Sequence, residues 1–123
     1  MTTKALLLVT AALEAATGIS LLTVPALVAA LLLGEPLDGA AAVAFARVAG
    51  IALISLAVAC WFARASKSPV TNGLVTGLLT YNAAVSMLLM ESALSGIHGP
   101  GLWPAVALHL LMACWCLFRL RAA

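Results

Sequence analysis

Four long apolar segments, separated by short connections, constrain the fold of this chain more than any other feature of its sequence. The connections read GEPLDG, RASKSP and SGIHGPG, and each contains residues that interrupt helices. Only 8% of the 123 residues are charged, against about 25% in soluble domains. The sequence therefore predicts an all-α integral membrane protein, an antiparallel four-helix bundle that forms one transmembrane domain over residues 1–123.

The predicted spans cover about residues 5–24, 39–63, 70–94 and 102–120. The first apolar segment continues to Leu33, which as one helix would be longer than the roughly 30 Å core of a bilayer. Pro25 cannot continue the hydrogen-bond ladder of a helix. We therefore expect a break there and a kinked segment, residues 25–33, near the membrane surface or in a cleft. The run has no small-residue cleavage site of the kind that follows a signal peptide, so this first span is expected to be retained.

The charged residues predict the orientation of the bundle. Glu35 and Asp38 lie in the first connection, and the third connection has only His98. The basic residues gather at the N-terminus, the second connection and the C-terminus: Lys4, Arg64, Lys67, Arg119 and Arg121. Because basic residues mark the cytoplasmic side, we expect a multi-pass membrane protein with both termini in the cytoplasm. No cluster of Lys and Arg suggests a nucleic acid as a partner.

Five polar side chains lie deep in the spans and form the predicted ligand-binding site: Glu14, Arg47, Tyr81, Asn82 and His109. At a rise of 1.5 Å per residue, their distances from the span ends place them in one layer near the middle of the membrane. Ionisable groups inside a membrane are costly and commonly mark a functional site. We therefore expect these residues to hold a ligand, a proton or a quinone, with Arg47 as the counter-ion of Glu14.

The same five residues also fit a structural role, in which a polar network fixes the register of the helices. Three function classes stay open. A binding or accessory subunit would hold a quinone-like or lipid-like molecule, or would dock on a larger membrane complex or a second copy of itself. A transporter would cycle a proton on Glu14. An enzyme would use the buried groups as acid–base catalysts on a lipophilic substrate, but the GxSxG, HExxH and CxxC motifs are absent, so no catalytic residue is identified.

No cofactor can be assigned from the sequence. His109 has no second histidine on a facing helix to complete the ligation of a haem, because His98 lies in a glycine-rich connection. Glu91, His98 and His109 lack the close spacing of a metal-ligand set, so no metal site is predicted.

Two further patterns concern packing. The stretch GLVTG places Gly73 and Gly77 at GxxxG spacing, which predicts a close helix contact on the third span. The cysteines lie near helix ends and are expected to pack as small apolar residues: Cys60, Cys114 and Cys116.

The stretch RVAGIALISLAVACWFAR, residues 47–64, follows a first span that ends in a proline. It resembles small four-helix bacterial membrane proteins of the DoxX-like and related uncharacterised families, in which an R-x-x-G motif recurs in the second span. Arg47 and Gly50 match that motif, and the likeness covers about the first half of the chain. The resemblance implies a four-helix bundle in a bacterial inner membrane, in some cases tied to quinone or redox systems, without a defined reaction.

The stretch AALEAATG carries a second likeness. Length, four spans and a glutamate in the first span make the chain similar to the small multidrug resistance transporters. Glu14 would then match their proton-binding and drug-binding carboxylate. The chain departs from that family in its third span, where Tyr81 is the only aromatic residue, and in Arg47, which would neutralise the carboxylate.

Overall fold

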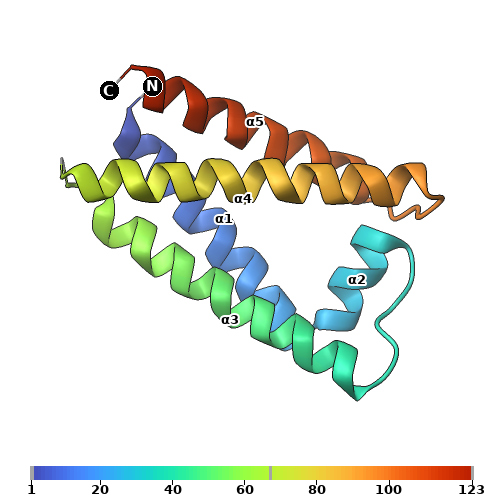
Figure 1. Ribbon diagram of the computed structural model, residues 1–123. Coiled ribbons are helices and arrows are strands. Elements are labelled where there is room, and N and C mark those ends of the chain that lie inside the picture. Colours follow the sequence, from blue (N-terminus) through green and yellow to red (C-terminus); the bar gives the residue numbers. More distant parts are fainter. Residues whose placement is uncertain (1, 67, 123) are drawn as a thin grey trace.

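The computed structural model describes residues 2–66 and 68–122, and every regular element in these ranges is an α-helix. The helices, labelled in Figure 1, are α1 (Thr3–Thr23), α2 (Pro25–Leu33), α3 (Ala40–Ala63), α4 (Pro69–Leu94) and α5 (Leu102–Arg121). Their bounds lie within two residues of the predicted spans, and α2 corresponds to the predicted kinked segment. The predicted all-α bundle is confirmed; Lys67 lies outside the described residues.

Local sequence signals explain where the helices begin. α1 follows Thr2, whose hydroxyl oxygen accepts a hydrogen bond from the N–H of Ala5. α4 follows Ser68, which caps the N–H of Val70 in the same way. Pro25 stands in the first turn of α2, where its missing N–H leaves no helical hydrogen bond unmade. The predicted break before Pro25 is therefore confirmed.

Four of the described helices, α1, α3, α4 and α5, are each long and apolar enough to cross a membrane. They contain 20 to 26 residues, and at 1.5 Å per residue they are about 30–39 Å long, enough for a hydrocarbon core of roughly 30 Å. In each helix, no more than a third of the most apolar stretch of 18 residues is buried inside the protein. The chain is therefore a multi-pass membrane protein whose outer helix faces contact lipid.

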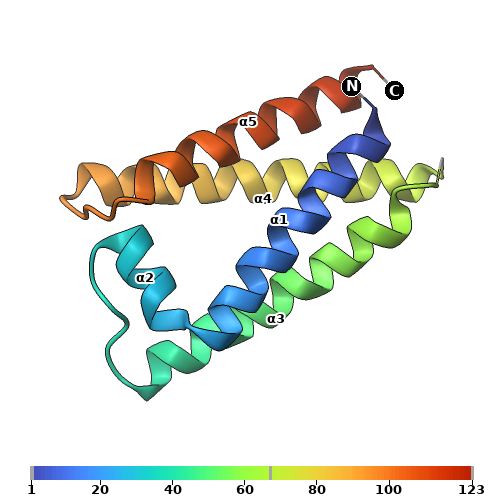
Figure 2. The same ribbon diagram turned by 180° about the vertical axis from the view of Figure 1, so that it is seen from behind.

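The four long helices form two antiparallel hairpins, one of α1 and α3 and one of α4 and α5 (Figures 1 and 2). Both chain termini and the connection between α3 and α4 lie at the same end of the molecule. We call it the basic end, because four basic residues lie there: Lys4, Arg64, Arg119 and Arg121. Toward the other end the two hairpins diverge, and α2 lies between them (Figure 1).

Two glycines bring the helices of the first hairpin into close contact. Gly18 of α1 lies against Gly50 of α3, and a Cβ atom on either glycine would lie only 2.7 Å from the backbone oxygen of the other. Any larger residue would therefore push the two backbones apart. The predicted close contact at Gly73 and Gly77 is wrong, because a Cβ atom on either residue would meet no described atom within 4 Å.

The short helix α2 packs on the connection between α4 and α5. The N–H of Gly101 donates a hydrogen bond to the backbone oxygen of Leu31, at 2.8 Å. A Cβ atom on Gly99 would lie only 2.3 Å from the backbone carbonyl group of Leu32, so glycine is needed for this approach. At the end opposite the basic end, α2 thus joins the two hairpins where they are farthest apart (Figure 2).

The hydrophobic core has two parts. Near the basic end, one cluster draws on all four long helices: Leu6, Leu7, Ala11, Cys60, Val75, Leu78, Met112 and Cys116. A second cluster belongs to α4 and α5 alone: Leu89, Ala93, Leu102 and Val106. The shared core therefore ends about halfway along α1. Cys60 and Cys116 pack in it as predicted, whereas Cys114 is exposed.

Candidate functional site

A small polar cavity lies just beyond the shared core, between α1 and the hairpin of α4 and α5. Its volume is about 50 Å³. It is lined by Leu13, Glu14, Thr17, Tyr81, Asn82, Leu108, His109 and Met112. The structure thus brings together four of the five residues predicted to form the site. Thr17 was not predicted as a site residue, although its position one turn beyond Glu14 on the same helix face was the available signal.

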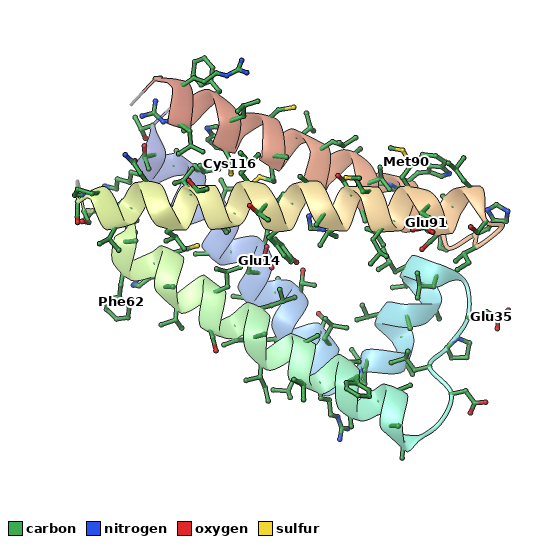
Figure 3. All side chains as sticks on the ribbon, viewed as in Figure 1. Glu14, Glu35, Phe62, Met90, Glu91 and Cys116 are labelled. Carbon is green, nitrogen blue, oxygen red and sulfur yellow. The ribbon has the colours of Figure 1, made fainter. Side chains whose placement is uncertain are left out.

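Glu14 contributes a buried carboxyl group. Only 6% of its surface is exposed, and no residue in the ranges 2–66 and 68–122 forms a hydrogen bond or an ion pair with it. In Figure 3 it lies next to α4, between the two hairpins. Removing a polar group from water without a partner is costly. A group in this setting is suited to bind a proton, a cation or the hydrogen-bond donor of a ligand.

Asn82 fixes the orientation of the His109 ring. The Nδ2 of Asn82 donates to the backbone oxygen of Leu78 at 2.8 Å, so its Oδ1 is the acceptor that lies 2.8 Å from Nδ1 of His109. This pattern assigns the proton of the neutral ring to Nδ1 and leaves Nε2 as a hydrogen-bond acceptor. Asn82 is 2% exposed, so little water competes for this contact.

Tyr81 forms another wall of the cavity. Its ring meets the ring of His109 edge to face, with the centroids 5.7 Å apart and an angle of 80° between the planes. This is a favourable geometry for two aromatic rings. The remaining side is more open, since Thr17 is exposed and Leu108 is 40% exposed. The cavity is therefore accessible from the lipid side of the helices.

The cavity offers both acceptors and donors of hydrogen bonds. An ionised Glu14 has acceptor oxygens only, and the Nε2 of a neutral His109 is also an acceptor. Asn82 uses one N–H on Leu78 and its Oδ1 on His109, and its second N–H remains a donor. Tyr81 and Thr17 each line the cavity with a hydroxyl group that can donate a proton. The acceptors at Glu14 and His109 are suited to a ligand group that carries an O–H, an N–H or a positive charge.

Arg47 does not belong to this site, so the predicted pair with Glu14 is wrong. Its side chain is exposed on α3, and no α3 residue lines the cavity. The reason lies in the crossing of the first hairpin at Gly18 and Gly50. Glu14 precedes Gly18 by four residues and Arg47 precedes Gly50 by three, and in an antiparallel pair these steps lead toward opposite ends. Along the helix axes the two residues are separated by about 10 Å.

Metal ligation finds no support in the described ranges, where no three His, Cys, Asp or Glu side chains are grouped closely enough to hold an ion. The cavity itself contains one carboxyl group and one imidazole. Both groups can take part in hydrogen bonds and can bind a proton.

Comparisons with protein-family models, with curated proteins and with solved structures find no match for this chain. The resemblances to the DoxX-like proteins and to the small multidrug resistance transporters therefore remain hypotheses. The geometry around Glu14 is the basis for a functional assignment.

Proposed function

We propose that the protein binds an amphipathic small molecule, quinone-like or lipid-like, whose polar group enters the cavity at Glu14. The observation that carries this proposal is the state of Glu14, which is 6% exposed, has no hydrogen-bond or ion-pair partner in the described chain, and shares a cavity with His109. A volume of about 50 Å³ fits a polar group of a few atoms, since a water molecule in the liquid occupies about 30 Å³. The apolar part of the ligand would lie outside, along Thr17 and Leu108.

The acceptors at Glu14 and His109 favour a ligand with hydroxyl groups. A quinol can donate an O–H to the carboxylate of Glu14 or to Nε2 of His109. The oxidised quinone has only carbonyl acceptors and would depend on the hydroxyls of Tyr81 and Thr17. The proposal therefore predicts that the site distinguishes the two redox forms of one molecule.

Two measurements test this function. Mass spectrometry of the intact purified protein identifies small molecules that are retained. Titration with a short-chain quinol and with its oxidised form, followed by tryptophan fluorescence in detergent, compares the two affinities. We expect the quinol to bind more tightly, and Glu14→Gln and His109→Phe each to weaken it about tenfold.

Arg47→Gln is the matched control, because this variant also neutralises a charged residue of the predicted layer, but one outside the cavity. Binding should be unchanged in this variant. If neither form of the quinone binds, the quinone class is rejected, and if Arg47→Gln weakens binding as much as Glu14→Gln, the cavity is not the site.

We further propose that the basic end faces the cytoplasm and that the protein resides in a bacterial inner membrane. The gathering of basic residues at one end and of Glu35 and Asp38 at the other supports this orientation. Figure 3 shows Glu35 on the connection between α2 and α3, away from the helices.

A second candidate function is proton-coupled transport, in which Glu14 exchanges a proton for a substrate. The observation that favours it is the exposure of Arg47, because the residue expected to neutralise the carboxylate lies elsewhere. Proteoliposomes with a pH gradient and an internal pH-sensitive dye would test it. A transporter would give substrate-dependent proton flux that Glu14→Gln abolishes, whereas a binding protein would give no such flux.

A further inference from the structure

A second polar pocket, unrelated to the cavity at Glu14, lies at the basic end. It is open, has a volume of about 700 Å³ and is formed by the start of α1, the connection between α3 and α4, the start of α4 and the end of α5. Three cationic side chains line it: Lys4, Arg64 and Arg119. No carboxylate is among the described residues that line it. An orientation signal alone requires only that basic residues lie on one side of the membrane; here they surround one pocket.

The arginines of this pocket are held by neighbouring groups. Arg119 donates from Nε to the hydroxyl oxygen of Thr3, at 3.1 Å, which ties the end of α5 to the start of α1. Arg64 lies over the ring of Trp61, with Cζ 3.6 Å from the ring centroid, and donates to the Trp61 backbone oxygen. Fixed guanidinium groups lose less conformational entropy when they bind an anion.

Two long helices begin at the same pocket. α1 has 21 residues and α4 has 26, and Thr2 and Ser68, their N-caps, both line the pocket. The N-terminus of a helix carries a partial positive charge and has free N–H groups, so it attracts anions. The two helix ends therefore attract an anion, as the three cationic side chains do.

Thr71 provides an independent indication of a ligand. It lines the pocket and is only 5% exposed. Among the residues that the structure describes, none forms a hydrogen bond with its hydroxyl group. The unpartnered hydroxyl of a buried threonine that lines a cationic pocket is a donor available to a bound oxyanion.

We propose that this pocket binds a phosphate group, either of an anionic lipid headgroup or of a soluble phosphate compound. A phosphate has three or more acceptor oxygens and up to two negative charges, which match three cations and a set of hydroxyl donors better than a carboxylate would. The pocket is larger than a phosphate group and leaves room for the rest of the headgroup or molecule. The site is independent of the function proposed for Glu14.

Two probes test the proposal and distinguish the sources of the phosphate. In the first arm, protein in detergent is titrated with inorganic phosphate, and its thermal stability is compared with that in chloride at equal ionic strength. In the second arm, protein from vesicles of phosphatidylcholine with phosphatidylglycerol is examined by native mass spectrometry. Saturable stabilisation by phosphate indicates a soluble ligand, and selective retention of phosphatidylglycerol indicates a lipid headgroup. If neither occurs, the proposal is overturned.

Variants separate a built site from diffuse positive charge. Arg64→Gln and Thr71→Val should each weaken binding about tenfold, and Thr71→Ser, which keeps the hydroxyl, should restore it. Arg121→Gln is the matched control, because it removes the same charge at the same end but is exposed and does not line the pocket. If Arg121→Gln weakens binding as much as Arg64→Gln, or if Thr71→Val has no effect while its thermal unfolding in chloride is unchanged, the site is refuted.

Discussion

At the scale of single residues, the hydrogen bond between Asn82 and His109 determines which atoms the cavity offers to a ligand. With Nδ1 of His109 engaged by Asn82, only Nε2 remains for a ligand or a proton. Loss of Asn82 would free the ring to rotate and to change its tautomer. The functional importance of Asn82 would then be to position His109.

The contribution of this hydrogen bond can be measured with Asn82→Leu, His109→Phe and the double variant. Asn82→Leu should lower stability in detergent, because it leaves the N–H of the half-buried His109 without its acceptor. The double variant should recover part of the loss, with a coupling of about 0.6–1.7 kcal/mol, as found for hydrogen bonds between membrane helices. Strictly additive losses would show that the two side chains do not interact.

A second double-mutant cycle concerns Glu14 and Arg47. The two residues share no contact and lie about 10 Å apart along the helix axes, so their effects on stability should add to within about 0.3–0.5 kcal/mol. Thermal unfolding of Glu14→Gln, Arg47→Met and the double variant checks this. If the double variant is more stable than the two single losses predict, Glu14 and Arg47 interact with each other, contrary to the structure.

The sequence was sufficient to select Glu14, Tyr81, Asn82 and His109, which line one cavity, because polar groups inside apolar spans are rare and have a cost. It was not sufficient to place Arg47. Depth counted from the span ends put Arg47 level with Glu14, whereas the actual levels depend on where α1 and α3 cross. That crossing is set by the contact of Gly18 with Gly50, and several other pairs of small residues on these two helices could have formed it.

At the scale of helices, the glycines differ sharply in what they do. Gly18→Ala should lower the unfolding free energy by about 1–3 kcal/mol, because its new methyl group would press on the backbone of Gly50. Gly77→Ala is the matched control: it faces open space and should be neutral or stabilising by about 0.5–1 kcal/mol, since alanine favours a helix. Thermal unfolding in detergent compares the two. Equal losses would place a close contact at Gly77 as well.

The helices themselves could be predicted closely from the sequence, because prolines, glycines and charged residues mark their ends. Their pairing could not. GxxxG spacing at Gly73 and Gly77 indicated a close contact, but a spacing motif does not identify the helix face that meets a neighbour. The helices are apolar on almost every side, so hydrophobicity does not separate the face toward protein from the face toward lipid.

At the scale of the whole molecule, the two ends differ in charge, and this difference predicts how the protein is oriented. Single cysteines at Asp38 and Ser95, at the end opposite the basic end, should react with a membrane-impermeant maleimide added outside intact cells. A cysteine at Ser66, at the basic end, should react only after the cells are opened. Labelling of the parent protein measures how far its native cysteines react, and this background is subtracted. Labelling of Asp38 or Ser95 only in opened cells would reverse the proposed topology.

The division into two hairpins also has a consequence for biosynthesis. The first hairpin leaves the ribosome before the second, and it contains the whole Gly18–Gly50 contact, so its helices can pair as soon as they are inserted. The walls that surround Glu14 belong largely to α4 and α5, which are translated later. During that interval the carboxyl group resides in an unfinished membrane protein, beside lipid or the insertion machinery. The time needed to translate and insert residues 69–121 therefore sets how long the nascent chain is exposed to misassembly or degradation.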